Sequence, residues 1–222
     1  MRAAIALTFL VCVSVLFAQK EFSATGDLAA AKQSYLNGKF DQAVAALDRF
    51  DKSSGATVQS LDLRGCIYLE QGKLDNASDA FQSAHVSNFD AFSPRIHFAD
   101  VLLYEKKFAD ARSEYEKLLG LTKTAIWLDY LRFAVLLTYL GEHDQAGAQN
   151  ALRAIVFPTE TPAYYYAQAA SAFGHGNKAE ARKWLNTARK LFDSSKTGWF
   201  DRGLYQLGWL KDKAAPSIDP FA

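Results

Sequence analysis

The sequence predicts an all-α protein, a solenoid of five helix pairs followed by one further helix at its C-terminal end. Three observations lead to this prediction. Five short segments follow one template at a nearly constant spacing, apolar residues recur at helical intervals between them, and a glycine stands where most of the first helices should end. Half of the 222 residues are hydrophobic, which is enough to build a core and excludes a chain that is disordered throughout.

The repeated template begins with glycine or lysine and ends with alanine. Its terminal alanines lie 34, 34, 35 and 35 residues apart. A fixed period of this length is the signature of a repeat architecture, in which each repeat forms one small unit of supersecondary structure. The five copies are Gly38–Ala43, Gly72–Ala77, Lys106–Ala111, Gly141–Ala146 and Gly176–Ala181.

Small residues mark where the two helices of each pair should approach closely. Larger side chains such as Tyr68, Phe81 and Tyr115 fill the remaining space, and because one pair cannot bury its apolar faces alone, the pairs must stack. The close-approach positions are Ala31, Gly65, Ala99, Ala134 and Ala169 in the first helices and Ala43, Ala77, Ala111, Ala146 and Ala181 in the second. The glycines predicted to end a first helix in the left-handed conformation are Gly38, Gly72, Gly141 and Gly176.

This pattern resembles the tetratricopeptide repeat (TPR) family, whose unit is a helix–turn–helix of 34 residues. In the second repeat, the residues at signature positions are Leu61, Gly65, Tyr68, Ala77, Phe81 and Ala84. The fourth repeat departs from the pattern, since Asn150 and Arg153 replace residues that are usually apolar, and its second helix is expected to pack loosely. The resemblance covers about residues 24–193. It implies a right-handed α-solenoid of five TPR helix pairs plus a C-terminal capping helix.

The resemblance also implies a binding site, because the first helices of TPR proteins line a concave groove. The corresponding surface is apolar and aromatic with few charges, which suits an amphipathic helix or an extended peptide with apolar side chains. The alternative is that some of these residues belong to the core between repeats. The groove residues are Tyr35, Asp62, Leu69, Ile96, Asp100, Leu103, Tyr104, Leu131, Val135, Tyr139, Tyr166 and Phe173.

The C-terminal segment starts another helix without a partner. Residues 197–211 include Trp199 and Trp209 and repeat the beginning of a first helix, so we expect a helix that covers the exposed end of the stack. The alternative is that its two tryptophans anchor a partner. Residues 213–222 contain two prolines and are predicted to be an extended tail.

The N-terminus is typical of a secretory signal peptide. Arg2 precedes an apolar run that ends at Ala18, before polar residues. The run of about 16 residues is shorter than the roughly 20 needed to span a membrane. We therefore predict removal of residues 1–18, no stable membrane span afterwards, and a periplasmic or secreted protein of bacterial type. An uncleaved anchor and a buried N-terminal helix are the alternatives.

The sequence shows no sign of an active site or a cofactor. With 25 basic and 24 acidic residues and no basic run, nothing indicates a nucleic-acid ligand. None of the four histidines has the spacing of a zinc-ligand pair, and motifs for a nucleophile or a phosphate loop do not occur. Cys66, the one cysteine left after removal of residues 1–18, is interpreted as a small apolar residue. No catalytic residue, metal or cofactor is predicted.

The predicted function is therefore binding. The leading hypothesis is an exported scaffold that binds another protein or peptide through the groove, in a process such as envelope assembly. A structural subunit that associates with its own copies is the alternative, with Trp199, Trp209 and the tail as the contact. An enzyme with an unrecognised site is the weakest hypothesis. The oligomeric state is not predicted.

Overall fold

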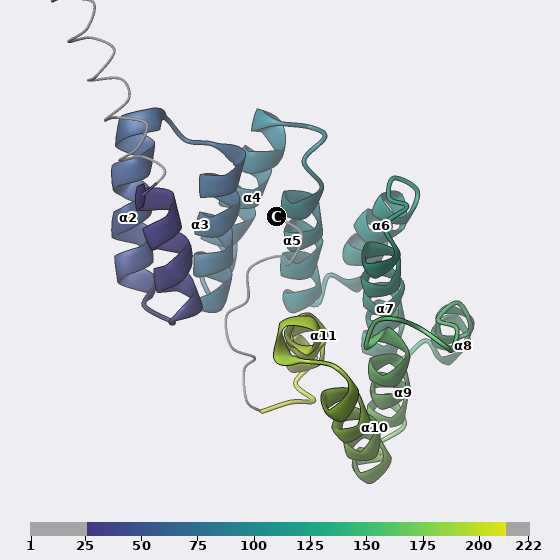
Figure 1. The fold of residues 1–222 in the computed structure, drawn as a ribbon. Coiled ribbons are helices and arrows are strands. Elements are labelled where there is room, and N and C mark those ends of the chain that lie inside the picture. Colours follow the sequence, from purple (N-terminus) through teal and green to yellow (C-terminus); the bar gives the residue numbers. More distant parts are fainter. Residues whose placement is uncertain (1–25, 212–222) are drawn as a thin grey trace, which may run out of the picture.

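The computed structural model describes residues 26–211, which fold into five helix pairs and one last helix (Figure 1). The described residues contain no β-strand, so the predicted all-α solenoid is confirmed. The expected signal peptide and the expected tail lie outside the described residues. The pairs are 26–36 with α2 (Phe40–Ser54), α3 (Val58–Glu70) with α4 (Leu74–Ser87), α5 (Phe92–Tyr104) with α6 (Phe108–Leu119), α7 (Ala125–Gly141) with α8 (Gln145–Arg153), and α9 (Ala163–Gly174) with α10 (Lys178–Leu191). The last helix is α11 (Ser194–Gln206).

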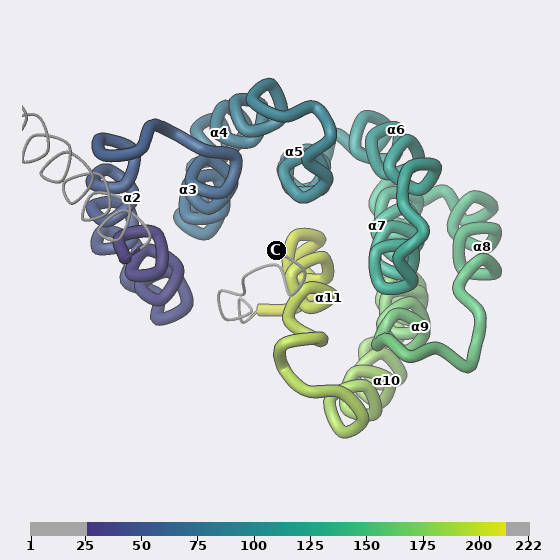
Figure 2. The backbone as a smooth tube through the Cα atoms, turned by 45° about the horizontal axis from the view of Figure 1, so that its top comes forward, coloured from purple at the N-terminus to yellow at the C-terminus, as the bar shows by residue number. Residues whose placement is uncertain are grey.

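The pairs follow one another along a curve, as Figure 2 shows. On the inner side lie α3, α5 and α7, while α4, α6 and α8 lie outside them. This two-layer arrangement turns the inner faces of helices from different repeats toward a common centre. None of the described helices is both long enough and apolar enough to cross a membrane.

The turns between the two helices of each pair share one left-handed residue. It is a glycine in three pairs, with φ of 68° at Gly38, 72° at Gly72 and 76° at Gly176, as predicted. In the other two pairs it is Lys106 (φ 61°) and His143 (φ 59°). The prediction for Gly141 is therefore wrong. Gly141 is the last residue of α7, and a Cβ atom there would lie 2.4 Å from the ring of Phe108.

The prediction for Ala146 is also wrong. Ala146 is exposed, and the buried alanine of this pair is Ala148. The first helix of the fourth pair, α7, has 17 residues, whereas α5 has 13 and α9 has 12. The additional turn moves the left-handed residue and the following alanine two positions later than the template suggested. The other close-approach residues of the template are buried as predicted.

The core has two parts. A smaller cluster joins the first two repeats, with Phe81 fully buried against Gly65, and a larger one joins the last three repeats. As expected, α8 packs loosely, because it has nine residues and only Ala148 is buried. The larger cluster also contains Trp199, Phe200 and Leu204 from α11, so the last helix is part of the core.

Candidate functional site on the concave face

The concave face is occupied by α11. This helix contacts α10, as a capping helix should, but it also contacts α5, α7 and α9. Figure 2 shows it inside the curve rather than over the end of the stack. The capping helix is thus present, and its position differs from the expected one because the curvature of the stack offers it an apolar inner wall.

Two aromatic side chains of α11 fill this wall. The Trp199 ring stacks on His97 of α5 at a centroid distance of 5.5 Å and meets the edges of Trp127 and Tyr130 of α7 at 5.7 and 5.6 Å. Trp199 is 4% exposed. The face of α11 that carries Trp199 is therefore fully desolvated.

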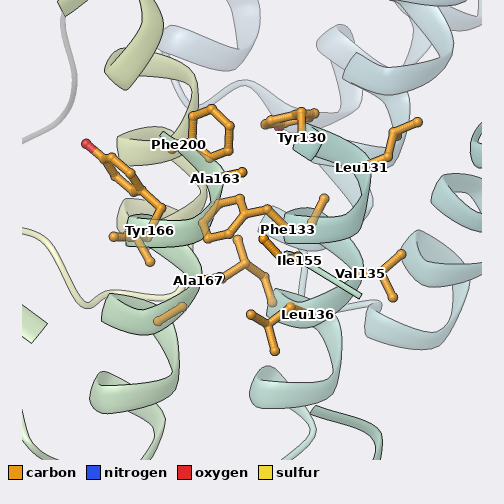
Figure 3. Close-up of a cluster of buried hydrophobic side chains, with 14 of the residues drawn as sticks. Tyr130, Leu131, Phe133, Val135, Leu136, Ile155, Ala163, Tyr166, Ala167 and Phe200 are labelled. Atoms are coloured by element: carbon orange, nitrogen blue, oxygen red, sulfur yellow. The ribbon is translucent and has the colours of Figure 1, made fainter. Parts of the chain in front are cut away.

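Phe200 is the second aromatic anchor and is 1% exposed. It packs among Phe133, Tyr166 and Tyr130 at centroid distances of 5.1, 5.3 and 5.8 Å (Figure 3). Gly203 follows one turn later, and a Cβ atom there would lie 2.6 Å from Leu137. The small residue lets α11 approach α7 closely.

Polar side chains of α11 are buried in the same interface. Arg202 forms an ion pair with Glu70 of α3 at 3.3 Å, and their side chains are 7% and 4% exposed. Gln206 donates a hydrogen bond to the backbone oxygen of Asp100 at 3.4 Å. Asp201 accepts a hydrogen bond from the hydroxyl of Tyr166 at 2.8 Å. Because buried polar groups are costly unless they are paired, these contacts select one position of the helix.

Beneath α11 lies the buried carboxylate of Asp100. Its Oδ1 accepts hydrogen bonds from the hydroxyls of Tyr115 (2.6 Å) and Tyr130 (2.8 Å), whereas its Oδ2 is buried without a partner among the described residues. Burial raises the pKa of Asp100, although His97 and these hydrogen bonds act in the opposite direction. The carboxyl is therefore easier to protonate than an exposed one.

A second polar group joins α3 to α5. Asp62 Oδ1 lies 2.9 Å from His97 Nδ1, and Cys66 Sγ lies 3.7 Å from the same nitrogen. Ser93 donates a hydrogen bond to Asp62 Oδ2 at 3.0 Å. In a catalytic triad, the nucleophile and the carboxylate contact opposite nitrogens of the imidazole. Here both contact Nδ1, so the group does not have the arrangement of a triad.

Electrostatics in this group favour a charged imidazole and a neutral thiol. Burial alone would lower the pKa of His97, but neighbouring Cys66 and the carboxylate of Asp62 raise it well above its ordinary value. Burial raises the pKa of Cys66, with His97 acting against it.

Several predicted groove residues contact the C-terminal segment. Phe173 stacks on Trp209 at 5.6 Å, Tyr104 interacts with Tyr205, and Tyr35 interacts with Arg202. Asp100 and Tyr166 contact α11 as described above, and Asp62 lies beneath it next to His97. These six residues are thus on the concave side. Binding of a partner there stays a prediction.

The remaining predicted groove residues belong to the core or to the outer layer. Leu69, Ile96 and Leu103 are buried in the two clusters. Leu131 and Val135 are buried as well, and Figure 3 shows both pointing away from Phe200. Tyr139 lies under the guanidinium of Arg112 of α6, 4.2 Å from its ring centre, and against Gly147 of α8. Leu131, Val135 and Tyr139 therefore do not line the surface that receives α11.

The residues of α7 that do receive α11 were missed. They are Trp127, Tyr130, Phe133 and Leu137. The sequence of α7 is apolar around almost its whole circumference, so its pattern does not indicate which side faces inward. Both tryptophans of the C-terminal segment are used within the chain, Trp199 against α5 and α7 and Trp209 against Phe173. Trp199 is thus buried within the chain, and Trp209 is half-buried.

Large apolar side chains are exposed at the connections between successive repeats. Phe89 between α4 and α5 is 69% exposed, Leu121 between α6 and α7 is 63% exposed, and Phe157 between α8 and α9 is 57% exposed. They come from separate loops, and each protrudes from its own connection.

Comparisons with known proteins agree with this architecture. The sequence matches no protein-family model and no curated protein. Solved structures do match. TTC0263, a thermophilic TPR protein of Thermus thermophilus, is similar with a TM-score of 0.61 and 18% identity over 83% of this chain and 98% of that chain. A tetratricopeptide repeat protein from Parabacteroides merdae gives a TM-score of 0.56 and 16% identity over 84% and 74% of the two chains.

A third similar structure is MamA of AMB-1, with a TM-score of 0.51 and 18% identity over 78% of this chain and 92% of that chain. Identities this low establish likeness of fold. The chain therefore has the TPR fold, a right-handed α-solenoid of helix pairs, as its repeats predict.

Proposed function

We propose that this protein is an exported scaffold that binds an amphipathic helix of another protein in its concave face, in exchange with α11. One observation carries the proposal. The concave face already holds a helix, and the contacts of α11 show what the surface accepts. Binding rather than catalysis is the activity that fits, because the side chains of this face serve to hold a helix through aromatic packing and an ion pair.

The side chains on the bound face of α11 indicate which features a partner helix needs. Trp199, Arg202 and Gln206 lie at intervals of three and four residues, so they form one stripe. Phe200 and Leu204 form a second stripe beside it. A partner should therefore present two aromatic anchors and a cation that can reach Glu70. Aromatic and arginine side chains are the usual dominant anchors of protein interfaces.

Competition with α11 sets the affinity that a partner must reach. A short connection, residues 192–193, links α10 to α11. Such tethering corresponds to an effective concentration in the millimolar range or above. A free helix therefore binds weakly while α11 is in place and more tightly when α11 is weakened.

The test uses a labelled synthetic peptide of residues 193–210, titrated into the full chain. We expect the affinity to increase at least tenfold in a chain carrying W199A, because the internal competitor is weakened. A peptide in which the positions of Trp199 and Arg202 are alanine should not bind. The chain variant F89A, which changes an exposed residue away from α11, should behave like the wild type. Absence of peptide binding in W199A, with helicity retained and α11 exchanging its amides freely, would refute the proposal.

Export belongs to the same proposal and has its own test. Arg2 and the apolar run up to Ala18 support cleavage after Ala18 and release outside the cytoplasm, where an envelope protein is the expected partner. The measurement is the N-terminal sequence of the protein isolated from a cell fraction. Recovery of a chain that starts at Gln19 from the periplasm or medium supports export, and recovery of Met1 from the cytosol contradicts it.

A further inference from the structure

We propose that Asp62, Cys66 and His97 form a zinc-binding site between the second and third repeats, beneath α11. Asp62 and Cys66 are four residues apart on α3 and therefore share one face of the helix. His97 lies on α5, in the next repeat. One oxygen, one sulfur and one nitrogen of these side chains lie within 4.8 Å of one another.

The main argument is that two side chains converge on one nitrogen. An imidazole nitrogen offers one in-plane position, which is either a proton or a lone pair. Asp62 Oδ1, at 2.9 Å from Nδ1, occupies that position. Cys66 Sγ, at 3.7 Å from the same nitrogen, can therefore only share that position with Asp62. An ion placed between the three atoms would bond to all of them.

The distances fit a tetrahedral ion. With the usual zinc bond lengths, tetrahedral angles separate a nitrogen from an oxygen ligand by about 3.3 Å and from a sulfur ligand by about 3.6 Å. The corresponding separations here are 2.9 Å and 3.7 Å. The oxygen and the sulfur lie within 4.8 Å of each other, so side-chain rotations that bring these two atoms closer complete the three bonds.

The donor set and its surroundings select the kind of metal. A thiolate and an imidazole favour zinc and similar ions over magnesium and calcium. Ser93 holds the other oxygen of Asp62 at 3.0 Å, which is the type of outer contact that orients a metal ligand. Phe81 and Trp199 pack against the His97 ring at 5.2 and 5.5 Å and restrict its rotation. Binding releases two protons to solvent, one from the thiol of Cys66 and one from Nδ1 of the charged His97 imidazole, because both atoms must be deprotonated to bond to the metal.

The test uses the full chain, reduced and freed of metal, and cobalt(II) as a spectroscopic probe. We expect a near-ultraviolet band from thiolate-to-cobalt charge transfer that saturates at one cobalt ion per chain and disappears when zinc is added. The variant C66S should lose the band, and H97Q and D62N should each weaken cobalt binding at least tenfold. H143Q, at an exposed turn, is the matched control and should bind as the wild type does.

Two further measurements make the test decisive. Zinc should raise the melting temperature of the wild type and leave that of C66S unchanged, and because serine is nearly isosteric with cysteine, circular dichroism should show that C66S keeps its fold. Cobalt uptake should be faster in W199A than in the wild type, since Trp199 covers the site. The proposal is overturned if the wild type, refolded with excess cobalt, shows no charge-transfer band. It is also overturned if the band persists in C66S and therefore comes from Cys12, the other cysteine of the sequence.

Discussion

The packing of Phe200 gives the sharpest quantitative test of the position of α11. Its side chain is 1% exposed and is enclosed by three aromatic rings with centroids 5.1 to 5.8 Å away. Truncation of such a side chain to alanine typically costs about 3–5 kcal/mol, because the transfer free energy is lost and a cavity remains. We expect the variant F200A to lose stability in this range.

The loss of stability in F200A should affect the docking of α11 as well as the unfolding of the whole protein. In a solenoid each unit is stabilised by its neighbours, so α11 can open before the repeats unfold. The cost to the whole protein is then limited by the free energy with which α11 docks. About 3 kcal/mol corresponds to roughly two orders of magnitude in an equilibrium constant, and amide protection in residues 194–206 should fall by that factor.

The assay combines urea denaturation, followed by circular dichroism, with hydrogen exchange measured by mass spectrometry. F89A is the matched control, because Phe89 is 69% exposed and its truncation should change the free energy of unfolding by less than about 0.5 kcal/mol. If F200A unfolds at the wild-type urea concentration and α11 keeps its protection, the helix does not pack in the concave face and the reasoning fails.

The repeats and the buried carboxylate give three further predictions. G65A places a Cβ atom 2.4 Å from the buried Phe81 ring and should lower the free energy of unfolding by about 1–3 kcal/mol, with partial recovery in G65A/F81L, measured by urea denaturation. K106G replaces a side chain that strains the left-handed backbone at φ 61°, so it should raise the melting temperature by an amount equivalent to about 0.5–1 kcal/mol. G72A introduces a side chain at a left-handed position with open space around it and should lower the melting temperature. D100N tests pH dependence. Burial raises the pKa of Asp100 above its ordinary 3.8, so the protonated form stabilises the fold. The wild type should therefore lose stability relative to D100N as the pH rises from 4 to 7, and a constant difference over that range would show that Asp100 does not titrate as described.

The periodic features of the fold could be read from the sequence. The left-handed turn and the following alanine recur in the first, second and fifth pairs at the expected places, because both depend on contacts within one repeat. The fourth repeat was misaligned by two residues. Its Gly141-Glu142-His143 segment offers a glycine before the true left-handed residue, and nothing local shows that α7 continues through that glycine.

The candidate site was predicted less well. Six of the twelve predicted groove residues lie on the concave side near α11, whereas Leu131, Val135 and Tyr139 point elsewhere. On α9, the helical frame taken from the family selects Tyr166 and Phe173, which both contact the C-terminal segment. It fails on α7, where Leu131 and Val135 point elsewhere. An apolar helix carries no pattern that distinguishes its inner side from its outer side.

One can read from the amino-acid pattern alone the number of helix pairs, their period and most of the small residues at which they cross, because these depend on interactions between residues less than one repeat apart. The position of α11 and the pairing of its polar side chains, in contrast, depend on how the repeats are arranged in space. Arg202 reaches Glu70, and Asp62 and Cys66 reach His97, because the curvature of the stack brings the inner faces of separate repeats together. That curvature is the sum of many small rotations between repeats, and no single segment of the sequence records it.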